Sequence, residues 1–147
     1  MKIQVSPLKK REIGKASNIV GKNYSRQYQR LATPELKEMF GKSNNKPTYF
    51  VAKDKEKILG FAGYIQSWMD YDAYEIFWVN VLPEHQKQGI GKMLVTKIIA
   101  DIKKRKKDGL IILSASIPNS KYYADYFKFK TVALFGKKKQ HLMTLAI

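Results

Sequence analysis

The chain changes character most sharply between Val81 and Leu94, where an apolar run ends at a proline and a glycine-containing loop leads into an amphipathic stretch. The loop reads Gln86-x-x-Gly89-x-Gly91. Glycine lets a backbone turn tightly and approach a ligand closely, because no Cβ stands in the way. The first turn of a following helix presents N–H groups without intrahelical partners at the positive end of the helix dipole. We therefore expect this segment to bind phosphate.

Two common phosphate-binding motifs do not fit the segment. A Walker loop requires Ser or Thr after its lysine, but Met93 follows Gly91-Lys92. A dinucleotide-binding fingerprint requires a third glycine, and none follows at the right spacing. The loop and its flanks, Val-x-Pro before it and Ile-Gly-Lys-x-Leu within it, resemble the GNAT family, the acetyl-CoA-dependent N-acetyltransferases. The signature of that family is Gln/Arg-x-x-Gly-x-Gly/Ala.

Composition limits the remaining alternatives. A length of 147 residues fits a single domain over residues 1–147, and 44% hydrophobic residues are enough for a packed core. Because the chain has no cysteine, it has no disulfide, thiol nucleophile or thiolate metal site. Its two histidines lie far apart, so we expect no metal. No segment has the pattern of a membrane span or signal peptide, so we expect a cytoplasmic protein without a membrane partner.

The formal net charge of +16 indicates an anionic partner. Lysine supplies most of this charge, whereas arginine, which forms paired hydrogen bonds with phosphate and guanine, occurs only at Arg11, Arg26, Arg30 and Arg105. The densest basic run, 103–107, falls where the helix after Gly89 should end, and cations there stabilise the helix dipole. We interpret the charge as solubility and attraction of an anionic cofactor, with nucleic-acid binding as a less favoured alternative.

The pattern of apolar residues predicts an alternating order of strands and helices. Strands are expected at 3–5, 48–52, 58–65, 74–81, 110–115, 131–135 and 141–147. Helices are expected from residue 7, over 33–40, from residue 89 and over 119–127. The order resembles the GNAT fold over nearly the whole chain. The resemblance implies an α/β (α+β) fold, with a mixed, mostly antiparallel sheet of about seven strands flanked by about four helices.

One helix carries a clear apolar stripe, formed by Ile90, Leu94, Val95, Ile98, Ile99 and Ile102. We expect this stripe to pack on the sheet and to hold the glycine loop in place. The resemblance implies that acetyl-CoA binds here. The pyrophosphate would meet the segment Gln86, Lys87, Gln88, Gly89, Ile90, Gly91 and Lys92, mainly through backbone N–H groups. The main chain of Val79, Asn80 and Val81 would pair with the pantetheine arm like an added strand, and Val81 could polarise the thioester carbonyl.

Acetyl transfer to an amine also requires a base. Strict alternation along the predicted strand 74–81 places Glu75, Phe77, Val79 and Val81 on one face. Glu75 is a carboxylate within an apolar strand, where desolvation would raise its pKa. It lies eleven positions before Gln86, the spacing of the catalytic glutamate in the histone-acetyltransferase branch of the GNAT family. Glu75 is therefore the expected base, with Asp70, Asp72 and His85 as alternatives.

The leaving thiolate requires an acid. Asn119 and Tyr126 resemble the Asn-x-x-Ala-x-x-x-Tyr pattern of the family, whose tyrosine hydroxyl faces the CoA sulfur, so both residues are also expected at the cofactor. The alanine of the pattern is replaced by Tyr122, and the Gly-Phe that usually follows reads Lys130-Thr131. This departure keeps Tyr123 open as the acid.

The acceptor is not encoded in a motif. The loop 67–72 combines Trp68 and Tyr71 with Asp70 and Asp72, which would suit a cationic amine or would equally form a capped loop. The predicted function is an acetyl-CoA-dependent N-acetyltransferase that acts directly on a primary amine of an unidentified acceptor. A catalytically silent CoA-binding module and a basic nucleic-acid-binding protein remain as alternatives, and a homodimer is left open.

Overall fold

A seven-stranded sheet organises the chain in a computed structural model that describes all residues 1–147. In chain order the strands and helices are β1 (Ile3–Pro7), α1 (Ile13–Asn23), α2 (Arg26–Lys37), β2 (Thr48–Asp54), β3 (Lys57–Gln66), β4 (Ala73–Val81), α3 (Ile90–Arg105), β5 (Leu110–Ala115), α4 (Ile117–Phe127), β6 (Lys130–Phe135) and β7 (Gln140–Ala146). The strand order across the sheet is β1-β2-β3-β4-β5-β7-β6. The predicted fold class is confirmed. No helix has both the length and the apolarity needed to cross a membrane.

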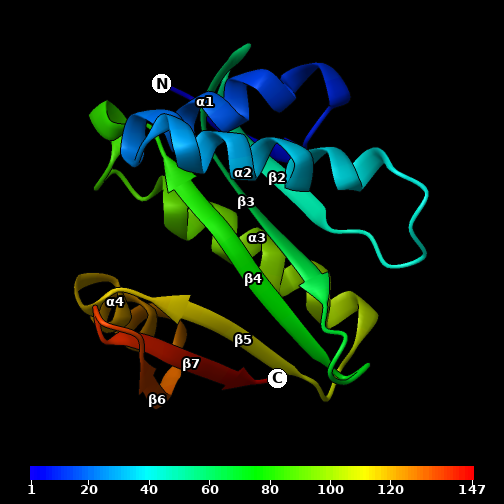
Figure 1. Cartoon of the computed structure of the whole chain (residues 1–147), viewed down its shortest axis with the longest axis vertical. Coiled ribbons are helices and arrows are strands. Elements are labelled where there is room, and N and C mark those ends of the chain that lie inside the picture. Colours follow the sequence, from blue (N-terminus) through cyan, green and yellow to red (C-terminus); the bar gives the residue numbers. More distant parts are fainter.

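The sheet opens between β4 and β5, as Figure 1 shows. These two strands are the sheet's parallel pair, and they pair only where Ala73–Glu75 meets Leu110–Ile112. Beyond this point β4 continues along β3, while β5 continues along β7. The backbone of β4 after Glu75 therefore has an unpaired edge, which faces the gap between the strands.

Helices cover both faces of the sheet. Helices α1 and α2 lie on one face, and α3 lies on the other, across β1 to β4 (Figure 1). The predicted apolar stripe of α3 is confirmed, because all six of its residues are buried in the core. Helix α4 packs against β5 and β7 on the far side of the opening. This packing places the first turn of α3 beside the end of β4.

Strict alternation along β4 fails at Trp78. Trp78 has a positive φ of 51°, and the pairing register with β3 shifts between Phe61 and Gly63. An extra residue of this kind is a β-bulge, which leaves one residue unpaired and reorients the side chains that follow. The Trp78 indole N–H donates to Glu35 of α2 at 3.1 Å, so this side chain lies on the α1–α2 face.

The predicted face of Val79 and Val81 is wrong, because the bulge turns both side chains to the other face of the sheet. A Cβ added to Gly91 of α3 would lie 4.0 Å from Val79 Cγ1 and 3.9 Å from Val81 Cγ2. Both valines therefore point toward α3, whereas Asn80 points toward Asn23 of α1. Glu75 precedes the bulge and so does not share a face with the two valines. The alternation rule could not detect the bulge, because the bulge depends on pairing with β3.

The start of α2 was also predicted wrongly. The helix begins at Arg26, with Ser25 as its N-cap accepting a hydrogen bond from the Tyr28 N–H at 3.3 Å. Pro34 lies inside the helix, not at the first turn of a helix spanning 33–40. Thr33-Pro34-Glu35 has the pattern of a helix start, but Thr33 already lies within the helix and donates from Oγ1 to the Gln29 carbonyl at 3.0 Å.

Candidate active site

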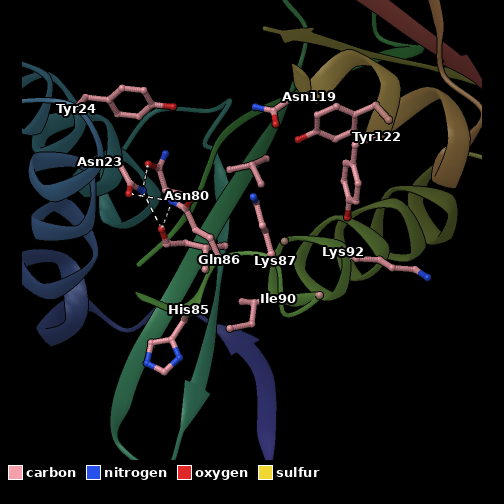
Figure 2. A pocket seen from close by; sticks show the side chains of 15 residues that line it. Asn23, Tyr24, Asn80, His85, Gln86, Lys87, Ile90, Lys92, Asn119 and Tyr122 are labelled. Carbon is pink, nitrogen blue, oxygen red and sulfur yellow. Dashed lines mark hydrogen bonds between the residues drawn. The ribbon is translucent and has the colours of Figure 1, made fainter. Parts of the chain in front are cut away.

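A cavity of about 500 Å³ lies where β4 ends and α3 begins (Figure 2). Ten of the residues predicted to contact the cofactor line it: Val79, Asn80, Val81, Gln86, Lys87, Gly89, Ile90, Gly91, Lys92 and Asn119. Gln88 and Tyr126 do not. The end of α1 adds Asn23 and Tyr24, and α4 on the other side adds Tyr122 and Tyr123, of which only Tyr123 was predicted as a functional residue. The structure thus brings the loop, the end of β4, the end of α1 and α4 around one space.

The glycine loop leaves room and hydrogen-bond donors for an anion. Gly89 is the N-cap of α3 with φ 85°, a conformation that side chains rarely adopt, and no side chain caps the helix. The N–H of Met93 bonds the Gly89 carbonyl, so the N–H groups of Ile90, Gly91 and Lys92 precede the first intrahelical bond. The Lys87 side chain points into the cavity in Figure 2. This arrangement can hold a phosphate group.

An amide network fixes the loop to β4 and α1. Asn23 donates from Nδ2 to Asn80 Oδ1 at 3.0 Å and to the Val81 carbonyl at 2.9 Å. Gln86, the first residue of the motif, donates from Nε2 to Asn23 Oδ1 at 3.1 Å and to the Val81 carbonyl at 3.2 Å (Figure 2). The Gln86 side chain therefore positions the loop. Asn23 carried no signal in the sequence, because its partners lie more than fifty positions away.

Two tyrosines of α4 face the cavity. The Tyr122 hydroxyl is buried without a hydrogen-bond partner, and burial, followed by the neighbouring Tyr126, raises the pKa of Tyr122 to about 12. Burial also raises the pKa of Tyr123, with smaller contributions from Tyr122 and Tyr24. Both phenols therefore carry their proton at neutral pH and are available as hydrogen-bond donors. Tyr126 is 58% exposed, and the Lys92 ammonium lies 4.3 Å from the centre of its ring.

Helix α4 ends two residues too early for the predicted alignment, in which Asn119 and Tyr126 match the family pattern and the helix would end at Lys130-Thr131. Lys128 caps the helix in the left-handed region with φ 68°, and the next residue, Phe129, is buried. This pair stands where a Gly-Phe pair would end the helix, two residues before Lys130-Thr131. If the family pattern is aligned on this helix end, it shifts by two residues. Its tyrosine then corresponds to Ala124, which has no hydroxyl. The hydroxyls at the cavity are then those of Tyr122 and Tyr123.

A second cavity, of about 750 Å³, continues the first into the gap between β4 and β5. The two cavities share Tyr24, Val79, Asn80, Asn119 and Tyr123. From there the second cavity extends along Tyr28, Phe77 and Trp78 on one side and along 113–116, Lys138 and Gln140 on the other. The shared residues make the two cavities one cleft, which runs from the first turn of α3 to the α1–α2 face.

The predicted bases lie at different places. Glu75 is half-buried where β4 is paired with both neighbours, opposite Ile65 and Ile112, and lines neither cavity. Phe77, two residues further along β4, lines the second cavity. His85 lines the first cavity, its Nδ1 lies 3.4 Å from Gln88 Oε1, and its ring points away from α4 in Figure 2.

The loop 67–72 lies at the other end of β4, a nine-residue strand that spans about 30 Å. It is a capped loop: Asp70 Oδ1 accepts the Asp72 N–H at 2.8 Å, and Ser67 Oγ accepts the Met69 N–H at 3.1 Å. Ser67, Trp68, Met69, Asp70 and Tyr71 line a separate cavity of about 590 Å³, and none of them lines either cavity of the cleft, so an acceptor pocket at this loop stays a prediction without support from the cleft. No three His, Asp or Glu side chains of residues 1–147 gather closely enough to hold a metal ion.

A glycine loop at the start of a helix, beside a strand whose edge is free, can bind a phosphorylated cofactor with an extended arm. Residues 15–129 match the model of the acetyltransferase (GNAT) family. The chain therefore belongs to the GNAT family of acetyltransferases, as its sequence motif predicted. No curated protein matches the chain.

Several solved structures share the fold. A GNAT-family protein from Desulfovibrio desulfuricans superposes with a TM-score of 0.87 at 14% identity, covering 99% of each chain. The PaiA N-acetyltransferase of Thermoplasma acidophilum, in complex with coenzyme A, has a TM-score of 0.74 at 18% identity over 100% of both chains. An aminoglycoside 6′-N-acetyltransferase complexed with coenzyme A has a TM-score of 0.76 at 16% identity, over 97% of this chain and 96% of that one. At these identities the likeness concerns the fold alone.

Proposed function

We propose that the protein transfers an acetyl group from acetyl-CoA directly to a primary amine. The observation that carries this proposal is the continuous cleft. One end presents the unbonded N–H groups of a helix start, and the other end opens beside the free edge of β4. A catalytically silent CoA-binding module needs only the end of the cleft at the start of α3, where the cofactor phosphates would bind. The second cavity, of about 750 Å³, favours the enzyme because it offers an amine a route to the thioester.

The residues of the first cavity fit coenzyme A. A Cβ at Gly89 would meet no atom within 4 Å, and one at Gly91 would meet only Val79 and Val81, at 4.0 and 3.9 Å. The space above the loop is thus free for a pyrophosphate, with Lys87 as a counter-charge. The edge of β4 over Val79–Val81 has no partner strand on the β5 side and can pair with the pantetheine arm.

The proton transfers are assigned to two side chains. Glu75 takes the amine proton through a water molecule, because it lies on the α1–α2 face two residues before Phe77 of the second cavity. Tyr123 returns a proton to the leaving thiolate, because it lines both cavities. Acetyl-CoA supplies the activated acyl group, and the chain orients the amine and moves the proton.

The test of the cofactor site is the substitution Gly91→Val. An added Cβ makes only ordinary contacts with Val79 and Val81, so the protein should fold but lose the increase in melting temperature that acetyl-CoA gives the parent protein. Gly14→Val is the matched control. Gly14 is also the second residue of a helix, and no atom lies within 4 Å of an added Cβ. Normal acetyl-CoA binding by folded Gly91→Val would show that the site is assigned wrongly.

The test of the activity is thiol release from acetyl-CoA in the presence of an amine panel, with the acetylated amine identified by mass spectrometry. The parent protein should release thiol in proportion to the amide formed, and Gly91→Val should not. Binding of acetyl-CoA without transfer to any amine would favour the silent module.

A further inference from the structure

We infer that the acceptor is an amine with one positive charge and an apolar or aromatic body, and that amines with a second positive charge are excluded. This inference rests on the proposed function, and it concerns the second cavity. A polyamine or an aminoglycoside needs several anionic groups along its site. The lining of the cleft, in both of its cavities, contains no Asp or Glu side chain.

Besides the proposed base Glu75, which takes the proton of the reacting amine, one carboxylate contacts a residue of this cavity. Glu35 of α2 accepts the Trp78 indole N–H through Oε1 at 3.1 Å, and Trp78 lines the second cavity. A carboxylate has a second oxygen and further lone pairs, so Glu35 can hold the indole and attract one ammonium group. The pairing also fixes the indole ring beside the cavity.

Aromatic rings supply the rest of the surface. Tyr24, Tyr28, Phe77, Trp78 and Tyr123 line the second cavity, and the rings of Tyr24 and Tyr28 lie 5.7 Å apart. Such rings attract a cation over their faces and bury an apolar body. The volume, about 750 Å³, lies in the range of pockets for small organic molecules.

The opposite wall carries a positive charge. Lys138, in the turn between β6 and β7, lines the second cavity, and no acidic side chain of the lining compensates it. With the reacting amine held near Glu35, a second ammonium on the acceptor would lie near this lysine, on a wall without an acidic side chain. Lys138 is exposed, so water and salt screen part of this repulsion, but like charges at the cleft still repel and Lys138 selects against dications.

Hexylamine and 1,6-diaminohexane test the selection, because they differ only in the second amine. The expected result is a kcat/KM for hexylamine at least ten times that for the diamine, with phenethylamine at least as good as hexylamine. Lys138→Glu should reduce the ratio several-fold. Lys137→Glu makes the same change of charge at an exposed neighbour that does not line the cleft, and it should leave the ratio unchanged.

Glu35→Gln tests the carboxylate. It should raise the KM for the amine about tenfold while kcat and the KM for acetyl-CoA change little, and Glu35→Asp should recover part of the loss. Preference for the diamine or for spermidine over hexylamine, or equal effects of the two lysine substitutions, would overturn the inference. These results leave the proposed function standing, because that function fails only if no amine is acetylated.

Discussion

Two carboxylates on the same face of the sheet differ in what surrounds them. Glu75 lies within β4, between two paired strands, whereas Glu35 lies on an exposed surface of α2 and holds the Trp78 indole. As the base, Glu75 would take the proton of the bound amine and affect kcat. Glu35 would attract the amine and affect its KM. The two glutamates should therefore affect different kinetic constants.

We expect Glu75→Gln to lower kcat by roughly 10²- to 10⁴-fold, the range for losing a positioned general base. Acetyl-CoA affinity should not change, because Glu75 lies outside the first cavity. Steady-state kinetics over a range of pH, together with a binding measurement, would check both points. A parent-like rate and pH profile would exclude Glu75 as the base, and the same measurement on His85→Ala would then decide whether the imidazole has this role.

Substitution by phenylalanine should show which tyrosine of α4 donates the proton to the thiolate. Tyr123→Phe should lower kcat, because this residue lines both cavities, whereas Tyr126→Phe should leave kcat unchanged, because Tyr126 lines neither. Tyr122→Phe removes a buried hydroxyl without a partner, so it should keep or slightly raise stability. Turnover and melting temperature of the three variants check this order. Loss of activity only in Tyr126→Phe would restore the register predicted from the sequence.

At the scale of elements, the ends of helices and strands shape the cleft. The bulge at Trp78 turns Asn80 toward α1 and the two valines toward α3, so that a single strand end serves both cavities. The end of α4 at Phe127 determines which tyrosines face the opposite wall. Both features depend on residues with positive φ that are not glycine, and such positions cost stability.

Lys128→Gly tests that cost. The cap has φ 68°, which costs an L-residue about 1 kcal/mol and costs glycine almost nothing. The variant should therefore be about 1 kcal/mol more stable to unfolding in urea, with α4 and the activity unchanged. Lys130→Gly, in the exposed strand β6, is the control and should lower stability. Destabilisation by Lys128→Gly would mean that the bond from Lys128 Nζ to the Asp125 carbonyl, at 3.0 Å, outweighs the backbone strain.

At the scale of the whole molecule, buried phenols make stability depend on alkaline pH. Burial raises the pKa of Tyr49, Tyr64 and Tyr123. A group whose pKa is higher in the folded state stabilises the fold fully below its unfolded pKa of about 10 and loses that contribution above it. The free energy of unfolding should fall above pH 10, by up to about 1.4 kcal/mol per pH unit for each tyrosine. Urea unfolding from pH 8 to 11 measures this slope, which Tyr64→Phe should reduce.

The charge of +16 should affect cofactor binding only through lysines near the loop. Lys87→Ala should weaken acetyl-CoA binding about tenfold, because this side chain points into the cavity. Lys92→Ala should have a smaller effect, since its ammonium lies over Tyr126, and Lys104→Ala at the far end of α3 should have none. Calorimetry at several salt concentrations tests this order and should show moderate screening.

Nucleic-acid binding should be weak and lost at physiological salt, as expected for lysine charge without base recognition. Tight binding to DNA or RNA under these conditions, retained in Gly91→Val, would favour the alternative of a nucleic-acid-binding protein. A filter-binding or anisotropy measurement on the parent protein and this variant decides between the two.

The sequence by itself determined the features that depend on near neighbours in the chain. The spacing of Gly89 and Gly91, the apolar stripe of α3 and the order of strands and helices follow from local backbone preferences and from one period of apolar residues. For the same reason, ten of the predicted cofactor-contacting residues line one cavity. The start of α2 was missed because Thr33-Pro34-Glu35 has the local pattern of a helix start, although it lies inside the helix.

Only the tertiary structure decided how distant segments meet. The bulge at Trp78 needs the register with β3, and the opening of the sheet needs β5 to leave β4 after three residue pairs. Asn23, Tyr24 and Lys138 reach the cleft from opposite ends of the chain. Their positions follow from strand pairing and helix packing, which join residues far apart in sequence, so no local pattern records them.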